Sequence, residues 1–186
     1  MASSTKMTVF VSFLRGVNVG GHKRVRMVDL AKVYDSLGFD KVQTYIQSGN
    51  VVFSCTKEDM ATLASRIARK MENQLGLTAD VFIRTLDEIE ELRARSPFKK
   101  DQIRVHVTFL KDKLLQVATD KLDAVRGEDE EYLVSGKEVF LYLPSGYGRS
   151  KLSNALLERV LKTRATTRNW NTVQALLQMA KDIIKK

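Results

Sequence analysis

The sequence predicts an α+β fold in which two ferredoxin-like βαββαβ units follow one another and a helix ends the chain. Three observations carry this prediction. Strand patterns and helix patterns follow the same order twice, a Ser-Gly turn marks a hairpin in each half, and glycine or proline separates most elements. The residues of the two halves barely align, so the shared order indicates an ancient duplication. We place the first unit at residues 7–96 and the second at residues 97–186.

The first half contains four strand patterns and two amphipathic helix patterns. We predict strands at 8–14, 42–47, 51–55 and 81–84, and helices at 27–37 and 60–71. The middle strands flank Ser48-Gly49-Asn50, which is typical of a hairpin turn. Gly38 and Gly76 follow the two helices, where glycine commonly ends a helix. A short polar helix at 86–95 leads to the second unit.

The second half repeats this order. We predict strands at 103–110, 132–134, 138–143 and 163–167, and helices at 114–125, 152–161 and 170–184. Ser135-Gly136-Lys137 forms the second hairpin turn, and Ser150 is the expected N-cap of the helix at 152. In the strand at 103–110 we expect one face to point inward, and His106 to lie on the other face. The inward residues are Ile103, Val105, Val107 and Phe109.

Composition indicates an ordinary globular protein of the cytoplasm. Hydrophobic residues make up 44% of the 186 residues and charged residues 28%. No run approaches the length of about 18 apolar residues that a membrane-spanning helix needs. The first six residues are polar and lack the apolar stretch of a secretory signal. The single Cys55 cannot form an internal disulfide, which fits a reducing compartment.

The net charge of +9 is confined to two segments. Residues 15–26 contain Arg15, Lys23, Arg24 and Arg26 with no acid. Residues 149–168 contain Arg149, Lys151, Arg159, Lys162, Arg164 and Arg168 against the single acid Glu158. These two segments account for the whole surplus, so the rest of the chain is balanced. Such confined charge favours an anionic partner over a merely basic surface.

Each basic segment lies beside a glycine-rich turn between a strand and a helix. In the first turn we predict ligand contacts from Arg15, Gly16, Asn18, Gly20, Gly21 and Lys23. In the second we predict them from Gly146, Gly148, Arg149, Ser150 and Lys151. Glycine lets the backbone approach a phosphate, helix N-termini attract anions, and arginine binds phosphate through two N–H groups. Turns whose glycines serve conformation alone are the alternative.

Two further expectations concern these turns. Arg149 and Lys151 at the start of a helix would oppose its dipole, a local cost that a bound anion would offset. The turns follow the first and third strands of their units, so a pseudo-twofold arrangement would bring them into one basic cleft. Thr166, Thr167 and Asn169 suit the N-cap of the last helix, where Trp170 fills the core. We add Arg168 to the predicted ligand-binding residues.

Three stretches carry a family resemblance. They are residues 14–21 (LRGVNVGG), residues 44–53 (TYIQSGNVVF), and residues 146–151 together with 165–172 (GYGRSK and ATTRNWNT). Together they resemble the bacterial family called domain of unknown function 1697 (DUF-1697), over about residues 7–181. Family members commonly carry a proline where this chain has Arg26. The resemblance implies a two-part α+β fold, and it implies no activity, because the family has no agreed function.

No constellation of catalytic or metal-binding residues is evident. The glycine spacing matches neither the dinucleotide fingerprint G-x-G-x-x-G nor the P-loop, so we expect no cofactor. His22 and His106 are the two histidines, and no His, Cys, Asp or Glu cluster has the spacing of a metal site. Cys55 has no evident base and is better explained by packing. The acidic run at 128–131 is expected to be a solvated surface.

Three functions are compatible with these sequence features. The first is a binding protein for a phosphorylated ligand or nucleic acid, although Tyr45 and Gln47 and the strand at 103–110 lack an RNA-recognition pattern. The second is an enzyme that acts on a nucleotide or other phosphorylated metabolite, with Ser150 or His22 in proton transfer. The third is a protein-interaction module or homodimer. None of the three involves a membrane.

Overall fold

The computed structural model describes residues 7–19, 24–99, 101–114 and 119–185. The chain packs as two compact units, one of Met1–Glu91 with Ala175–Lys186 and the other of Leu92–Gln174. It crosses between them within helices α3 (Leu86–Arg95) and α6 (Trp170–Lys185). The last helix, which the sequence assigns to the second unit, therefore contributes most of its length to the first.

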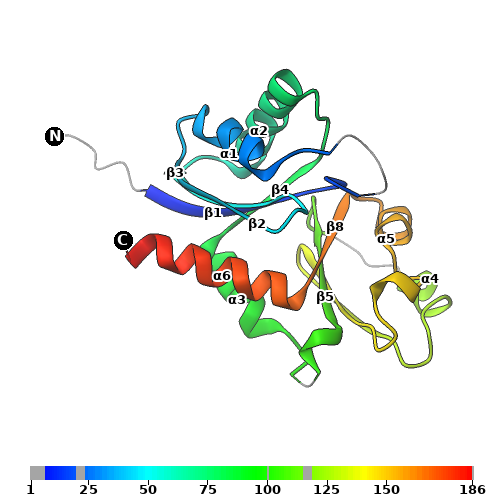
Figure 1. Ribbon diagram of the computed structural model, residues 1–186. Coiled ribbons are helices and arrows are strands. Elements are labelled where there is room, and N and C mark those ends of the chain that lie inside the picture. Colours follow the sequence, from blue (N-terminus) through cyan, green and yellow to red (C-terminus); the bar gives the residue numbers. More distant parts are fainter. Residues whose placement is uncertain (1–6, 20–23, 100, 115–118, 186) are drawn as a thin grey trace. The chain divides into compact units, whose positions relative to one another are not determined.

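The first unit has the predicted βαββαβ order. Its elements are β1 (Met7–Leu14), α1 (Met27–Asp35), β2 (Asp40–Tyr45), β3 (Asn50–Thr56), α2 (Met60–Leu75) and β4 (Val81–Thr85). The strands form an antiparallel sheet in the order β2-β3-β1-β4. Helices α1 and α2 cover one face of this sheet, and the later part of α6 lies on the other (Figure 1). Residues 9–14 of β1 are therefore buried on both faces, which explains why apolar residues predominate there.

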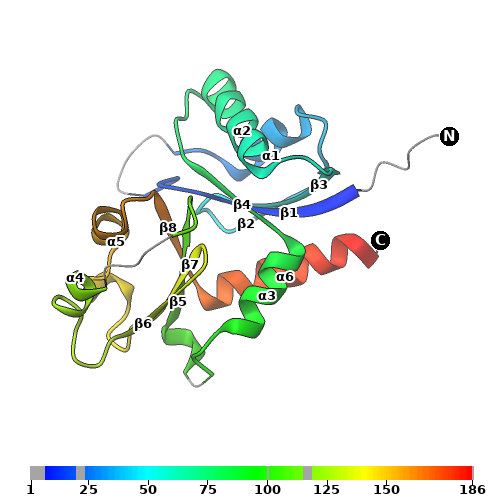
Figure 2. The same ribbon diagram turned by 180° about the vertical axis from the view of Figure 1, so that it is seen from behind.

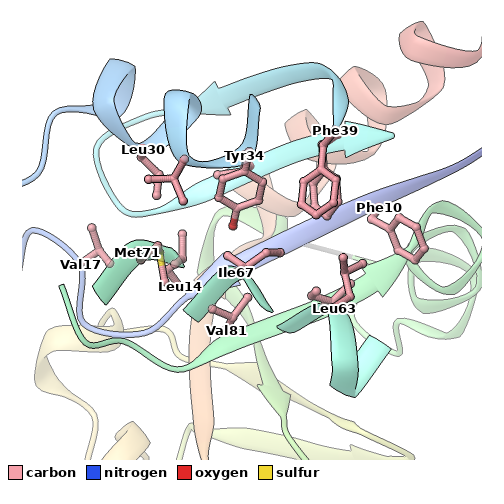
Figure 3. Close-up of a cluster of buried hydrophobic side chains, with 14 of the residues drawn as sticks. Phe10, Leu14, Val17, Leu30, Tyr34, Phe39, Leu63, Ile67, Met71 and Val81 are labelled. Carbon is pink, nitrogen blue, oxygen red and sulfur yellow. The ribbon is translucent and has the colours of Figure 1, made fainter. Parts of the chain in front are cut away.

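The core of the first unit lies between the sheet and helices α1 and α2 (Figure 3). Alternate residues of β1 and β3 point into it, including Phe10 and Phe53, because side chains alternate along a strand. Tyr34 of α1 packs edge-on against Phe53, with ring centroids 5.2 Å apart. Its hydroxyl shares a 2.8 Å hydrogen bond with Ser12 Oγ, so a polar group is satisfied inside an apolar core.

The second unit repeats the same topology. Its elements are β5 (Val105–Leu110), α4 (Asp120–Asp123), β6 (Glu131–Ser135), β7 (Glu138–Tyr142), α5 (Asn154–Leu161) and β8 (Ala165–Asn169). The antiparallel sheet has the order β6-β7-β5-β8, which matches the first sheet strand for strand (Figure 2). A second apolar core lies against one face, and it contains Leu110, Leu141 and Leu157. The predicted α+β fold with two duplicated units and a C-terminal helix is confirmed.

Several predicted boundaries in the second unit are wrong. Helix α5 begins at Asn154 instead of 152, because Ser153 is its N-cap and accepts a hydrogen bond from Leu156 N at 3.4 Å. Helix α4 has only four residues, 120–123, where the sequence predicts a helix at 114–125, and residues 115–118 lie outside the described chain. Ile103 lies in a 3-10 turn and is 68% exposed, because the strand alternation begins only at Val105.

The sequence predicts the start of α6 better than its end. Asn169 caps the helix as expected, since its Oδ1 accepts a 2.8 Å hydrogen bond from Thr172 N, and Trp170 is buried. Near the other end Ile183 is buried, whereas Ile184, the last residue of the predicted helix, is 65% exposed. Helices α2 and α6 have 16 residues each, and within the described ranges no helix is long and apolar enough to cross a membrane.

Candidate functional site

The first glycine-rich turn is held at its start by the ends of two neighbouring segments. Leu14 N donates to Gly49 O at 2.8 Å, and Arg15 N donates to Asp80 O at 3.0 Å. Gly16 then turns the chain with φ +73°, a conformation that favours glycine, and it is exposed. The backbone at Arg15 and Gly16 is thus fixed at the surface of the first unit.

Asn18 fastens this turn to the rest of the unit through every polar group of its side-chain amide. Nδ2 donates to Val25 O at 2.9 Å and to Gln47 O at 2.8 Å, and Oδ1 accepts from Val25 N at 2.8 Å. Its φ of +57° lies in the left-handed region, which asparagine tolerates better than most residues. If this turn binds a ligand, Asn18 acts there as a positioning residue.

The first turn and the first hairpin turn pack directly against each other. Gly49 has φ +71°, and a Cβ placed on it would lie 2.8 Å from Leu14 Cβ and 3.1 Å from Val17 Cβ. The stretches 14–21 and 44–53, which carry the family resemblance, therefore meet in space. Residue 46 has φ +49°, and β2 ends at Tyr45, so the predicted strand at 42–47 extends two residues too far and Gln47 lies outside it.

The remaining cations of the first basic segment differ in their surroundings. Gly20, Gly21, His22 and Lys23 lie outside the described residues. Arg26 forms a two-point ion pair with Asp29, with Nε–Oδ2 at 2.7 Å and Nη2–Oδ1 at 3.0 Å. This hydrogen-bonded pair lowers the pKa of the Asp29 carboxyl. Asp29, which lies just beyond residues 15–26, thus neutralises one of the four cations of that segment.

The second glycine-rich turn is a compact, internally bonded loop. Gly146 has φ +85° and ψ 154°, a backbone conformation that essentially only glycine adopts. Gly146 N donates to Leu143 O at 2.9 Å, and Arg149 N donates to Gly146 O at 3.1 Å, which closes a 3-10 turn at Tyr147–Arg149. Gly148 is exposed, and space for a Cβ there is open. The turn therefore has a defined shape with an unobstructed outer surface.

Tyr147 anchors the second turn, and the sequence prediction missed it. Its ring stacks on the His106 ring with centroids 5.4 Å apart, and its hydroxyl accepts a 3.0 Å hydrogen bond from Asn154 N at the start of α5. Asn154 Oδ1 in turn accepts from Thr167 Oγ1 at 2.6 Å. The available signal was that Tyr147 is the one aromatic residue in a stretch otherwise made of proline, glycine, serine and cations.

His106 is therefore part of the support of this turn. The sequence placed it opposite the inward-pointing residues of its strand, in a sheet-surface or interface role, and in the structure it is half-buried there with its ring stacked on Tyr147. Its Nδ1 lies 3.2 Å from Arg104 O, and burial lowers the pKa of the imidazole. At neutral pH the ring is uncharged, which favours the tautomer that donates from Nδ1 to this carbonyl.

Arg149 and Lys151 extend from the second turn into solvent. Both side chains are exposed, and within the described part of the chain neither makes an ion pair. Ser150 Oγ accepts a 3.0 Å hydrogen bond from Leu152 N, so this hydroxyl shapes the loop. The expectation that both cations oppose the dipole of a helix is wrong, because α5 begins only at Asn154 with Ser153 as its cap.

Arg168 lies in β8 and is largely buried. Nη1 donates to Thr166 Oγ1 at 2.9 Å and to Thr167 O at 2.8 Å. Burial lowers the pKa of the guanidinium to about 10, so it stays charged at neutral pH. These contacts hold the cation within the sheet.

Cys55 is buried, as a packing role requires. Burial raises the pKa of its thiol to about 11, so at neutral pH the thiol is protonated and suited to packing rather than nucleophilic attack.

The acidic run at 128–131 is not solvated along its whole length. Glu130 is only 9% exposed, and its Oε2 accepts a hydrogen bond from Gly127 N at 2.9 Å. The prediction of a wholly solvated run is therefore wrong for that residue.

Comparison with known proteins shows which family this chain belongs to. The sequence pattern of the family described as "Protein of unknown function (DUF1697)" matches residues 7–140, which include the first turn and end before Gly146. No curated protein matches the chain. A similar solved structure is that of the conserved bacterial protein SP0830 from Streptococcus pneumoniae, with 23% identity and a TM-score of 0.67. The match covers 94% of this chain and 99% of that one, and at such identity it shows the fold alone. The chain belongs to the DUF1697 family, whose function is unknown.

Proposed function

We propose that this protein binds a phosphorylated ligand, either a small molecule or a nucleic acid, through the exposed cations of the turn at 144–151. The observation that carries the proposal is that the side chains of Arg149 and Lys151 are exposed and make no ion pair within the described residues. They lie close together in sequence on an ordered turn, they are exposed, and in the described ranges no carboxylate neutralises them. The planar guanidinium suits two-point binding of phosphate, and the ammonium adds a point charge.

The fixed backbone of this turn favours a role in ligand binding over a role in solubility alone. Gly146 and the Tyr147 hydroxyl fix the backbone on both sides of Arg149, so little backbone entropy is lost when a ligand binds. Exposed Gly148 leaves room for a phosphate to approach the backbone. Some other basic residues pair with acids, as in Arg66–Glu58 and Lys181–Glu90.

The first turn extends the proposal. Gly16 is exposed in the left-handed conformation beside Arg15, and the side chain of Asn18 holds this backbone in place. The idea that both turns contribute to one cleft remains a prediction. A cytoplasmic location, inferred from the single buried Cys55, would expose the protein to nucleotides and other phosphorylated metabolites.

The salt dependence of binding tests the proposal. For the wild-type chain with a fluorescein-labelled single-stranded oligonucleotide, log Kd should rise linearly with log salt concentration. Each phosphate contact contributes a slope of about 0.7. The double variant Arg149→Ala, Lys151→Ala should therefore lose about 1.4 units of slope. Fluorescence anisotropy between low and moderate salt measures both slopes, and competition with ATP or pyrophosphate distinguishes a small ligand from a polymer.

A matched control removes the same charge elsewhere. Lys57 and Arg69 are exposed residues of the first unit, and Lys57→Ala, Arg69→Ala lowers the net charge by the same amount. This control should keep the wild-type slope and affinity. Equal losses in both double variants would reduce the effect to overall charge, and a flat salt response of the wild-type chain would rule the proposal out.

A further inference from the structure

Strand β6 forms one edge of the second sheet. It pairs with β7 along one side, and among the residues that the structure describes no strand pairs with its other side. An edge strand presents alternating N–H and C=O groups that an added strand can satisfy. On this edge Leu133 is 43% exposed, so an apolar side chain stands beside the unpaired backbone.

Open hollows adjoin β6. One of about 430 Å³ follows the edge of the strand, where Glu131, Tyr132, Leu133 and Val134 line it together with Asp123 and Arg126. Two others, of about 420 and 470 Å³, share Glu131 and Tyr142 as lining residues. The side chains of an added strand alternate between faces. Successive side chains of such a strand would therefore meet the hollow along the edge and the hollows beside Tyr142 in turn.

The two hollows lined by both Glu131 and Tyr142 have the chemistry of a cation site. Glu131 lies directly opposite Tyr142 in the β6–β7 register, and the Tyr142 ring lies 5.7 Å from that of Phe98. Glu128 and Asp129 line the second hollow, and among the described residues Lys99 is the cation that lines the first. In the part of the chain that the structure describes, Glu128, Asp129 and Glu131 form no ion pair. Aromatic faces beside carboxylates favour guanidinium and ammonium groups.

We propose that β6 binds an extended basic segment of a partner protein as an additional strand. The backbone of that segment would pair with the unpaired edge of β6. An arginine or lysine side chain would lie against Tyr142 and Phe98 with its charge beside Glu131. The neighbouring side chain would enter the hollow between β6 and α4. This site would differ from the proposed phosphate-binding turn in the ligand that it selects. It would bind a positively charged group, whereas the turn would bind a negatively charged one.

Three labelled peptides of eight residues test this inference with the full chain. The first alternates arginine and valine, the second has glutamate in place of arginine, and the third has proline in place of valine. We expect only the first to bind with a measurable Kd in fluorescence anisotropy, because proline cannot donate to a ladder. The chain carries a net charge of +9, so nonspecific attraction would favour the glutamate peptide instead.

Charge reversal locates the binding site. Glu131→Lys, Asp129→Lys should weaken binding of the arginine peptide at least about tenfold, since like charges then face each other. The control Asp35→Lys, Glu91→Lys changes two exposed acids elsewhere by the same amount and should leave affinity within about twofold. Failure of the arginine peptide to bind, equal binding of the proline peptide, or equal losses in both variants would overturn the proposal. So would light scattering that shows a dimer which Leu133→Arg dissociates, because β6 would then bind a second copy.

Discussion

Gly49→Ala is expected to lower the free energy of unfolding of the first unit by about 3 kcal/mol. Two effects add. An alanine held at φ +71° costs about 1 to 2 kcal/mol, because left-handed backbone crowds the Cβ. The new Cβ would also lie 2.8 Å from Leu14 Cβ, so the first turn must shift, and such overpacking costs about 1 to 3 kcal/mol. Urea unfolding followed by circular dichroism measures the difference.

Gly16→Ala is the matched control for this prediction. Gly16 has nearly the same φ, +73°, but no atom lies within 4 Å of a Cβ placed there. Only the backbone strain should appear, a loss of about 1 kcal/mol. Equal losses at Gly49 and Gly16 would show that the close packing of the hairpin turn on Leu14 contributes nothing.

Phe53→Ala is expected to lower the free energy of unfolding by about 4 kcal/mol, the typical cost of removing a fully buried aromatic ring. Phe53 has no exposed surface and contacts three rings. Centroid distances are 5.7 Å to Phe10, 4.7 Å to Phe39 and 5.2 Å to Tyr34. Its removal leaves a cavity at the centre of the cluster, where β3, β1 and α1 cannot close together.

Phe53→Leu is the control variant for Phe53→Ala, and it distinguishes lost packing from a general loss of the fold. Leucine refills much of the volume, so the expected loss is about 1 kcal/mol. Both variants are compared with wild type by urea unfolding, with near-ultraviolet circular dichroism to confirm native packing before the titration. A loss below about 1 kcal/mol for Phe53→Ala would contradict the central place of this ring.

The fold of the first unit could be predicted because its local signals agree. Strand β1 is rich in apolar, β-branched and aromatic residues, α2 has an amphipathic stripe, and Gly76 ends that helix at φ +60°. In the second unit the local signals compete. The sequence predicts Ser150 as the cap of α5, whereas the cap is Ser153, and Asn154 N beside it donates to the Tyr147 hydroxyl, a contact between residues seven apart.

The candidate site could be located but not resolved from sequence. Charge counting found the segments of Arg15 and Arg149, but it could not show that Asp29 already pairs with Arg26. Residue type also suggested that Asn18 contacts a ligand, whereas its amide is fully engaged by Val25 and Gln47. Such contacts depend on loop geometry, which composition and periodicity do not encode.

A ¹H–¹⁵N NMR titration of the full chain with pyrophosphate tests directly whether the turn at 144–151 binds phosphate. We expect saturable shifts of the amides of Gly148, Arg149 and Lys151, which disappear in the Arg149→Ala, Lys151→Ala variant and persist in Lys57→Ala, Arg69→Ala. Amide shifts at 146–151 that stay unchanged while the oligonucleotide still binds, or that are the same in both variants, would contradict this expectation.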